Sequence, residues 1–251
     1  MSDGIELLIE GKVAHVVLSR PDRRNAFDTA MLARFEDILQ ELGRNRGIEV
    51  AVLRARGTTF CAGSDLKELE RLSASDTLHW QRRTGEIVER WARLDITTLT
   101  AFNGPAVGSG AVVGLASDIR VATDDTYFIF PEVAFGIPLT WSGIPLLTPL
   151  LGADRLKRAL LLKEKLGIEE LKQLGLFARI VPQQELVAAT AHTVEVLLAT
   201  SLLARQMTKR AIAASVAAPG FATGAFEPVL ASLGILAREQ DGFAFGKDPL
   251  R

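Results

Sequence analysis

The sequence predicts an α/β protein in which strands and helices alternate before the chain becomes mostly helical. Two stretches support this prediction, at residues 50–68 and 96–118, because in each an apolar, β-branched run passes through small residues into a helical pattern. A third observation is the part from Trp141 onward, where helical patterns are separated by glycines and a proline. Together these features put helices between the strands and at the end of the chain.

The elements expected in the N-terminal half follow from their patterns of apolar residues. Ile5 to Glu10 and Val13 to Leu18 alternate and are joined at Gly11-Lys12, which predicts a hairpin. A helix from about Asp28 to Leu42 carries its leucines and Phe35 on one face. The next elements expected are the strand Val50 to Arg54, a helix from about Asp76 to Leu94 and the strand Ile96 to Phe102.

The second half is expected to hold short strands and then a series of helices. The strands expected are Ile119 to Ala122 and Tyr127 to Phe130. The helices expected are Ala153 to Leu162, Ile168 to Leu174, Gln184 to Leu198, Leu202 to Val216 and a last one in the tail from Phe221. Strand, strand and helix thus recur, without a sequence repeat of fixed period.

Composition and charge restrict the class of protein. The chain has 251 residues, 48% of them apolar and 24% charged, which predicts a globular protein with a sizeable core. Its net charge of −1 gives no overall attraction to nucleic acid or to a lipid surface. Cys61 is the only cysteine, so the chain cannot form an internal disulfide or a cysteine-based metal cluster.

The N-terminus and the most apolar stretch predict where the protein works. Residues 1–8 lack the basic and long apolar regions of a targeting segment, so we expect the mature chain to begin here and to be cytoplasmic. The run from Ile129 to Leu151 is interrupted by Pro131, Pro138, Pro145 and Pro149, and it cannot be a membrane helix. No membrane association is expected.

The glycine-rich stretch from Asn103 to Asp118 is the first candidate for a functional site. Glycines at 108 and 110 let a backbone approach a ligand closely, and a helix beginning near Ser109 presents unpaired N–H groups with the positive end of its dipole. This arrangement suits an anion. The same small residues would equally let a helix pack deeply, so this stretch alone leaves both interpretations open.

A similar turn lies earlier, from Thr59 to Glu68. It also passes through Ala62-Gly63 into a segment with acidic residues in its first turn. Two such turns could direct their N–H donors at one oxygen. That arrangement is an oxyanion hole, which stabilises negative charge developing on a carbonyl oxygen.

These two turns resemble motifs of the crotonase (enoyl-CoA hydratase/isomerase) superfamily. Its members carry phenylalanine-x-alanine-glycine-x-aspartate early and asparagine-glycine-x-alanine-x-glycine-x-glycine later. The matching segments here are Phe60-Cys61-Ala62-Gly63-Ser64-Asp65 and Asn103-Gly104-Pro105-Ala106-Val107-Gly108-Ser109-Gly110. The resemblance implies that the backbone N–H groups of Ser64 and Ser109 are the two donors.

The resemblance also implies a fold and an assembly. It implies an α/β, crotonase-type spiral of ββα repeats over residues 1–196, with a C-terminal helical region at 197–251. In crotonases this region covers the active site and joins three subunits, so we expect a homotrimer or a dimer of trimers. Some family members bind RNA, but the net charge does not favour that role here.

The implied substrate is an acyl-CoA thioester, with coenzyme A as part of the substrate and with no separate cofactor or metal. The family's arginine-proline-x-x-x-asparagine-alanine loop lies against the nucleotide end of coenzyme A, and it matches at Arg20, Pro21, Asn25 and Ala26. In the tail, Phe243, Phe245 and Lys247 match positions that reach a neighbouring subunit's coenzyme A. The expected substrate-binding residues are Arg24, Ala26, Ala62, Asp65, Leu66, Lys67, Gly108, Val112, Phe135, Trp141 and Lys247.

The reaction depends on two further positions, which here are Val112 and Glu132. Family hydratases need a carboxylate at both, and Val112 cannot supply one. The glycine-rich segment that helps to position water in hydratases is here Leu139-Thr140-Trp141-Ser142, a second departure. One carboxylate beside an oxyanion hole suffices to move a double bond, with Glu132 taking and returning the proton. Phe130, Val133, Phe135 and Trp141 are expected to exclude water from Glu132 and raise its pKa.

We therefore predict a Δ3,Δ2-enoyl-CoA isomerase, with an enoyl-CoA hydratase or a hydrolase or decarboxylase variant as alternatives. A non-catalytic acyl-CoA-binding subunit remains the alternative of another class. A dehydrogenase is disfavoured: Gly104, Gly108 and Gly110 have a dinucleotide-turn spacing and Asp124 follows, but Tyr127, the only tyrosine, lacks a lysine four residues later. The three histidines, His15, His79 and His192, lie outside the motifs and are expected to be structural.

Overall fold

The protein's structure is a computed structural model that describes residues 4–217. The chain divides into two compact units, Met1–Glu195 and Val196–Arg251. The tail positions Phe243, Phe245 and Lys247 lie outside the described residues, and so does the helix expected from Phe221.

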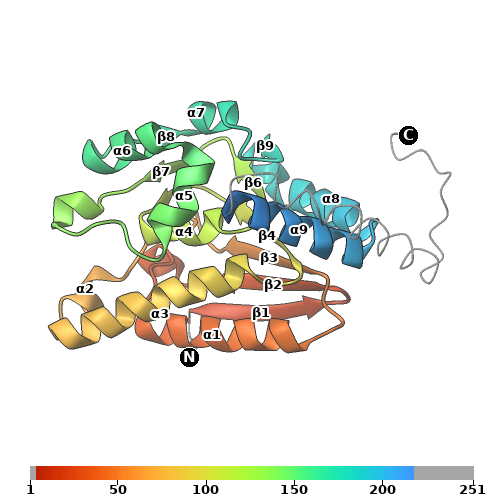
Figure 1. Cartoon of the computed structure of the whole chain (residues 1–251), viewed down its shortest axis with the longest axis horizontal. Coiled ribbons are helices and arrows are strands. Elements are labelled where there is room, and N and C mark those ends of the chain that lie inside the picture. Colours follow the sequence, from red (N-terminus) through yellow and green to blue (C-terminus); the bar gives the residue numbers. More distant parts are fainter. Residues whose placement is uncertain (1–3, 218–251) are drawn as a thin grey trace. The chain divides into compact units, whose positions relative to one another are not determined.

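Six strands of the first unit form the main sheet, in the order β1-β2-β3-β4-β6-β9 (Figure 1). The hairpin pair β1 and β2 is antiparallel, as the sequence predicts, and the remaining neighbours are parallel. A smaller sheet has the order β5-β7-β8. The strands are β1 (Ile5–Glu10), β2 (Val13–Leu18), β3 (Val50–Ala55), β4 (Thr97–Phe102), β5 (Ala106–Val107), β6 (Ile119–Thr123), β7 (Tyr127–Ile129), β8 (Leu166–Gly167) and β9 (Arg179–Val181).

Helices follow the strands, so that the chain runs strand, strand, helix several times. Asp28 caps the first long helix by accepting a hydrogen bond from the N–H of Met31 at 2.8 Å. The α-helices are α1 (Thr29–Arg44), α2 (Leu66–Leu69), α3 (Ala74–Ala92), α4 (Ser109–Leu115), α5 (Gly143–Leu151), α6 (Ala153–Leu161), α7 (Ile168–Gln173), α8 (Leu186–Leu198) and α9 (Leu202–Ala217). The short 3-10 helices are η1 (Pro21–Arg23), η2 (Glu132–Phe135) and η3 (Gln183–Glu185).

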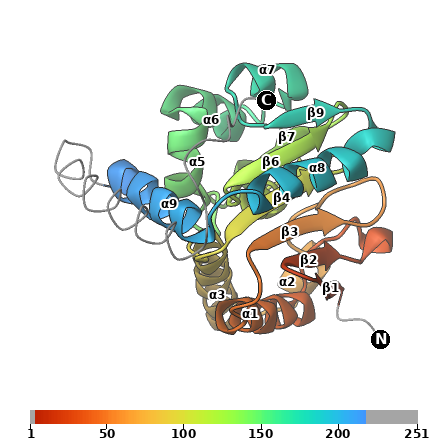
Figure 2. The ribbon, with the colours of Figure 1, turned by 90° about the vertical axis from the view of Figure 1, so that its right-hand side faces the viewer.

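The main sheet has helices on both sides because its strands are apolar on both faces. Ala14, Val16 and Leu18 of β2 pack into the core with Phe35 of α1. The alternate residues, such as His15, face the other side, where α8 lies over the sheet (Figure 2). α1 and α3 run beside each other on the opposite side from α8 (Figure 1).

Successive turns of the chain stack directly on one another beside the main sheet. Phe27 forms a parallel bridge with Ser64, and Cys61 forms one with Ala106. β5 then pairs with β7, and the N–H of Gly108 donates to the carbonyl of Ile129 at 2.8 Å. This stacking brings residues 25–27, 61–64, 106–109 and 128–132 into adjacent layers, although they are far apart in sequence.

Some elements differ from the sequence prediction. The segment after Asp65 forms only the four-residue helix α2, and the short strands β5, β8 and β9 were not predicted. Two or three residues are too few to show an alternating pattern, so these segments become strands only because they pair with neighbouring strands. α5 was also missed because it contains Pro145 near its start and Pro149 in its interior.

Within residues 4–217, no single helix is long and apolar enough to cross a membrane. The helical segments Gln183–Leu198 and Leu202–Val216 reach the length and apolar composition of a membrane span only when the two are taken together.

Candidate active site

The two glycine-containing turns meet, as the sequence predicts. At Gly63 the backbone φ is 91°, and a Cβ there would lie 2.9 Å from the carbonyl of Val107 and 3.7 Å from the backbone nitrogen of Ser109. The hydroxyl oxygens of Ser64 and Ser109 are 3.2 Å apart. Only glycine allows this close approach, because any side chain at position 63 would push the two turns apart.

Both turns leave a backbone N–H unused. Beside Ser64, the bridge to Phe27 uses the carbonyl of Gly63 and the N–H of Asp65, each in a 2.8 Å hydrogen bond. Ser109 is the first residue of α4, whose cap residue Gly108 provides no side-chain acceptor. Across the described part of the chain, neither the Ser64 nor the Ser109 N–H has a hydrogen-bond acceptor. Two unpaired donors on touching turns can hold one negatively charged oxygen.

Glu132 lies directly against the second turn. The Cβ that Gly108 lacks would stand 2.3 Å from Oε1 of Glu132, and Gly108 itself has a φ of 52°. The residue is 9% exposed, and its Oε2 is buried without a hydrogen-bond partner. Burial raises the pKa of Glu132, because a charged carboxylate is poorly solvated there. A carboxyl group with a raised pKa is a stronger base than an exposed one, and it can accept and return a proton.

Val112 occupies the second position at which the family's hydratases carry a carboxylate, and its surroundings are apolar. Val112 is fully buried within α4. A Cβ at Gly143 would lie 3.0 Å from Cγ2 of Val112 and 2.8 Å from Cδ2 of Leu139. Val112 therefore packs beneath the start of α5 and the preceding loop, and its side chain offers no hydrogen bond to a water molecule.

The loop before α5 forms an aromatic wall. Trp141 is buried and makes edge-to-face contacts with Phe27 and Trp80, at centroid distances of 5.2 and 5.5 Å. Trp141 and Ser142 have φ values of 60° and 54°, which non-glycine residues adopt rarely. The hydroxyl of Ser142 donates to Oε1 of Glu89 on α3 at 2.8 Å and holds the loop in place.

The prediction that Val133 and Phe135 help to exclude water from Glu132 is wrong. Phe130 is fully buried, but Phe135 is 57% exposed and Val133 is also exposed. Both belong to η2, a short helix that turns their side chains outward once its first residue is buried. The low exposure of Glu132 therefore does not come from covering by Phe135 or Val133.

The loop expected to hold the nucleotide end of the substrate touches the first turn through its backbone. The N–H of Ala62 donates to the carbonyl of Arg24 at 2.9 Å, while the Arg24 side chain is exposed. Ala26 is buried, and its carbonyl accepts a hydrogen bond from Arg20. On the other side of the first turn, α2 presents Leu66 and Lys67 to solvent.

Two residues of this loop hold the site together, and their structural role was missed from the sequence. Arg20 forms ion pairs with Asp28 at 3.0 Å and with Asp65 at 3.3 Å. The fully buried Asn25 accepts from the N–H of Arg20 and donates to the carbonyls of Arg56 and Thr59, all at 2.9 Å. The motif match identified both positions, but it did not predict the ion pairs of Arg20 or the hydrogen bonds of Asn25.

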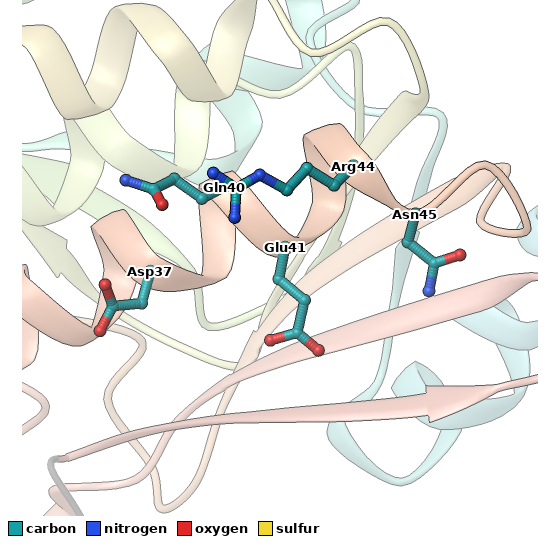
Figure 3. A pocket seen from close by; sticks show the side chains of 5 residues that line it. All are labelled: Asp37, Gln40, Glu41, Arg44 and Asn45. Atoms are coloured by element: carbon teal, nitrogen blue, oxygen red, sulfur yellow. The ribbon is translucent and has the colours of Figure 1, made fainter.

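Other features of the described residues do not form a comparable site. No cluster of three or more histidine, cysteine and acidic side chains within residues 4–217 is placed to hold a metal ion. A hollow of about 360 Å³ on the outer side of α1 is lined by side chains of that helix and its cap alone, Asp37, Gln40, Glu41, Arg44 and Asn45 (Figure 3). The buried Cys61 thiol, whose pKa burial raises to about 12, is not a nucleophile.

Comparison with known proteins assigns the fold and the site to a family. The sequence profile of the enoyl-CoA hydratase/isomerase family matches residues 9–230, most of the chain. The chain belongs to the enoyl-CoA hydratase/isomerase family. This match confirms the predicted crotonase superfamily.

The similar proteins include one named as an isomerase/hydratase and one named as a hydratase. The enoyl-CoA isomerase/hydratase fer4 of Mycosarcoma maydis is 31% identical over 212 residues, which cover 80% of this chain and 76% of fer4. The short-chain-enoyl-CoA hydratase of Clostridium acetobutylicum is 26% identical over 204 residues, covering 81% of this chain and 78% of that enzyme.

Solved structures confirm the predicted crotonase-type α/β fold. Enoyl-CoA hydratase subunit I of Geobacillus kaustophilus HTA426 matches with a TM-score of 0.87 at 29% identity, over 95% of this chain and 92% of that one. A protein of Thermobifida fusca YX assigned to the enoyl-CoA hydratases, in complex with acetoacetyl-CoA, matches with a TM-score of 0.84 at 28% identity, over 95% and 96%.

Proposed function

We propose that the protein isomerises a 3-enoyl-CoA to the conjugated 2-enoyl-CoA, using one glutamate and two backbone donors. One combination of residues carries this proposal. Glu132 is buried against Gly108, and position 112 has a valine in place of a second carboxylate. The acetoacetyl-CoA complex of the Thermobifida fusca relative supports an acyl-CoA thioester as the substrate.

In the proposed reaction, the thioester oxygen lies between the N–H groups of Ser64 and Ser109. Glu132 removes a proton from C2, and the electrons of that C–H bond shift toward the carbonyl to form a dienolate. The two N–H groups stabilise the negative charge on the oxygen. Glu132 then returns the proton at C4, which moves the double bond into conjugation with the thioester.

Isomerisation is favoured over hydration because of what surrounds Val112. Adding water to a double bond requires a water molecule held by polar groups beside the reacting carbons. Val112 packs against Leu139 and the start of α5 and leaves such a water without a partner on that side. Proton transfer between two carbons needs only the one carboxylate.

Measuring both reactions on the same protein tests the proposal. We expect conversion of a 3-enoyl-CoA, followed by absorbance of the conjugated thioester, and weak or absent hydration of crotonyl-CoA. Glu132→Gln keeps the size of the side chain but cannot accept a proton, so it should bind substrate and lose turnover. Full isomerase activity in Glu132→Gln would remove Glu132 from the mechanism.

The raised pKa of Glu132 predicts opposite effects on rate and on stability. The base acts as a carboxylate, so kcat should rise with pH through the raised pKa and then level off. Burying that carboxylate costs stability at neutral pH, and the cost vanishes at acidic pH, where the group is protonated in both the folded and the unfolded state. Glu132→Gln should therefore increase the free energy of unfolding at pH 7 but not at pH 4. Denaturant unfolding at both values checks this, and an unchanged stability at pH 7 would contradict the buried charge.

Three alternatives correspond to definite outcomes of these measurements. Fast hydration by the unmodified protein would indicate an enoyl-CoA hydratase; the Ser64 and Ser109 hydroxyls, 3.2 Å apart, would be the polar groups available to hold water. Tight binding of acyl-CoA with no turnover of any thioester would indicate a non-catalytic binding subunit. Release of free coenzyme A would indicate a hydrolase.

We also propose that the protein assembles as a homotrimer or a dimer of trimers. Exposed apolar side chains on α9, Ile212 and Val216, support an interface in the C-terminal unit. Multi-angle light scattering at micromolar concentration should return three or six chains. A monomer under those conditions would rule the assembly out.

A further inference from the structure

A second cavity lies on the other side of the main sheet from α1. It has a volume of about 560 Å³, lies between the sheet and α8 and is partly open to solvent. Its floor includes His15 of β2, Arg54 of β3 and Asn103 just after β4, and its roof includes Leu186 and Val194 of α8. The volume is in the range of small-molecule sites in proteins, roughly 300–1,000 Å³.

Three buried polar atoms around this cavity have no partner among the described residues. They are Nδ1 of His15, Nε of Arg54 and Oδ1 of Asn103. Asn103 is only 5% exposed, and its amide nitrogen is already used in a 2.7 Å hydrogen bond to the carbonyl of Gly57. Unsatisfied buried polar groups are few in native proteins, so three around one cavity, from three separate segments of the chain, call for an explanation. His15 uses its other ring nitrogen, Nε2, which lies 3.8 Å from Oε2 of Glu10.

The charge inside the cavity is positive. The guanidinium of Arg54 is half-buried and forms no ion pair within residues 4–217. The acidic residues of the lining, Glu10 and Glu195, have side chains that are 73% and 78% exposed, and the Glu10 carboxylate faces His15 and not Arg54 in the ion-pair contacts of the described residues. Glu6, on the same face of the sheet, is bound by Arg56 at 2.9 Å. The pKa of His15 is lowered, first by burial and then by the charge of Arg54, so His15 is neutral at pH 7.

The remaining lining is apolar and extends along α8. Val13 of β2, Leu186 and Val194 line the cavity beside the polar atoms. A ligand that fits this arrangement needs an anionic group for Arg54, a hydrogen-bond donor for Oδ1 of Asn103 and an aliphatic chain.

We propose that this cavity binds an aliphatic carboxylic acid that carries a hydroxyl group close to its carboxylate. The carboxylate pairs with Arg54, the hydroxyl donates to Asn103, and the chain lies against the apolar residues of α8. This site is distinct from the one built by Glu132 and the two donor turns, because its lining includes neither Glu132 nor residues 61–64 or 106–109. Binding of the acid in this cavity does not depend on which reaction takes place at the first site.

Titration calorimetry with 3-hydroxyoctanoate tests the proposal. We expect one bound molecule per chain, with at least tenfold weaker binding of octanoate, which lacks the hydroxyl, and of 1,3-octanediol, which lacks the carboxylate. Saturating acetoacetyl-CoA should leave the binding unchanged, because it would occupy the other site. Loss of binding in the presence of acetoacetyl-CoA would locate the acid at the first site and overturn the proposal.

Two variants and a control locate the binding in this cavity. Arg54→Gln should weaken 3-hydroxyoctanoate at least tenfold, whereas Arg179→Gln, which changes an exposed arginine on β9, should not change it. Ala191→Trp fills the cavity from an exposed position on α8 and should abolish binding without affecting folding. Undiminished binding in both cavity variants would overturn the proposal. So would an absence of binding to the unmodified protein at millimolar acid, which would mean that water, another part of the chain or a second copy fills the cavity.

Discussion

The two turns that provide the proposed oxyanion donors are fixed by different means. Ser109 begins α4, a seven-residue helix in which every residue is buried. Ser64 precedes α2, a four-residue helix with no buried residue. The first donor is held by a buried helix and by backbone pairing of β5 with β7, whereas the second depends on the bridge to Phe27 and on the ion pair between Arg20 and Asp65. The same chemical group can thus be positioned by a buried helix or by a network of polar contacts, and the two should respond differently to mutation.

The largest effect should come from Gly108, where the buried turn contacts the base. In Gly108→Ala the new Cβ would stand 2.3 Å from Oε1 of Glu132, in a backbone conformation with φ 52° that alanine adopts poorly. Glu132 must move, and we expect kcat for isomerisation to fall by about a thousandfold or more, beyond the loss of a single donor. Steady-state kinetics on the folded variant measures this.

Gly11 provides the control for backbone strain. Its φ is 59°, close to that of Gly108, but nothing lies within 4 Å of a Cβ placed there. Gly11→Ala should cost about 1 kcal/mol of stability or somewhat more through strain, with kcat unchanged. If the two variants lost activity equally, the contact with Glu132 would not be the cause.

The next effect is the removal of each donor by proline. Ser109→Pro and Ser64→Pro each delete one N–H, and each should lower kcat about a hundredfold, as the loss of one oxyanion donor does. Proline suits the first position of a helix, so Ser109→Pro should keep its melting temperature better than Ser64→Pro. Kinetics and thermal unfolding on the same samples check both statements. Normal turnover in a folded proline variant would exclude that residue as a donor.

The smallest effect concerns the polar network behind Ser64. Arg20→Met removes the ion pairs with Asp28 and Asp65, and we expect kcat to fall about tenfold with a loss of about 1–3 kcal/mol in the free energy of unfolding. Arg23→Met changes an exposed arginine of the same loop and serves as the control. If Arg20→Met lost stability but kept its kcat, the network would be structural only, and the position of Ser64 would not depend on it.

The sequence alone determined the family and the alternation of strands and helices, and it provided the residues that we propose as the reactive groups. Glycines at 63 and 108 predicted close backbone approaches, because only glycine lacks the side chain that would block them. Glu132 with Val112 motivated the proposal of isomerisation, since one position has a carboxylate and the other does not. These properties are local, and they can be predicted from residue type and spacing.

Only the tertiary structure decided how these local features meet. Ser64 and Ser109 are 45 residues apart, and their hydroxyls approach to 3.2 Å because successive turns of the spiral pair through single bridges and two-residue strands. Such short pairings have no sequence pattern of their own. The ion pairs of Arg20, the outward position of Phe135 and the cavity at His15, Arg54 and Asn103 likewise depend on which elements the fold places side by side. Each arises from contacts between segments distant in sequence, which no local pattern specifies.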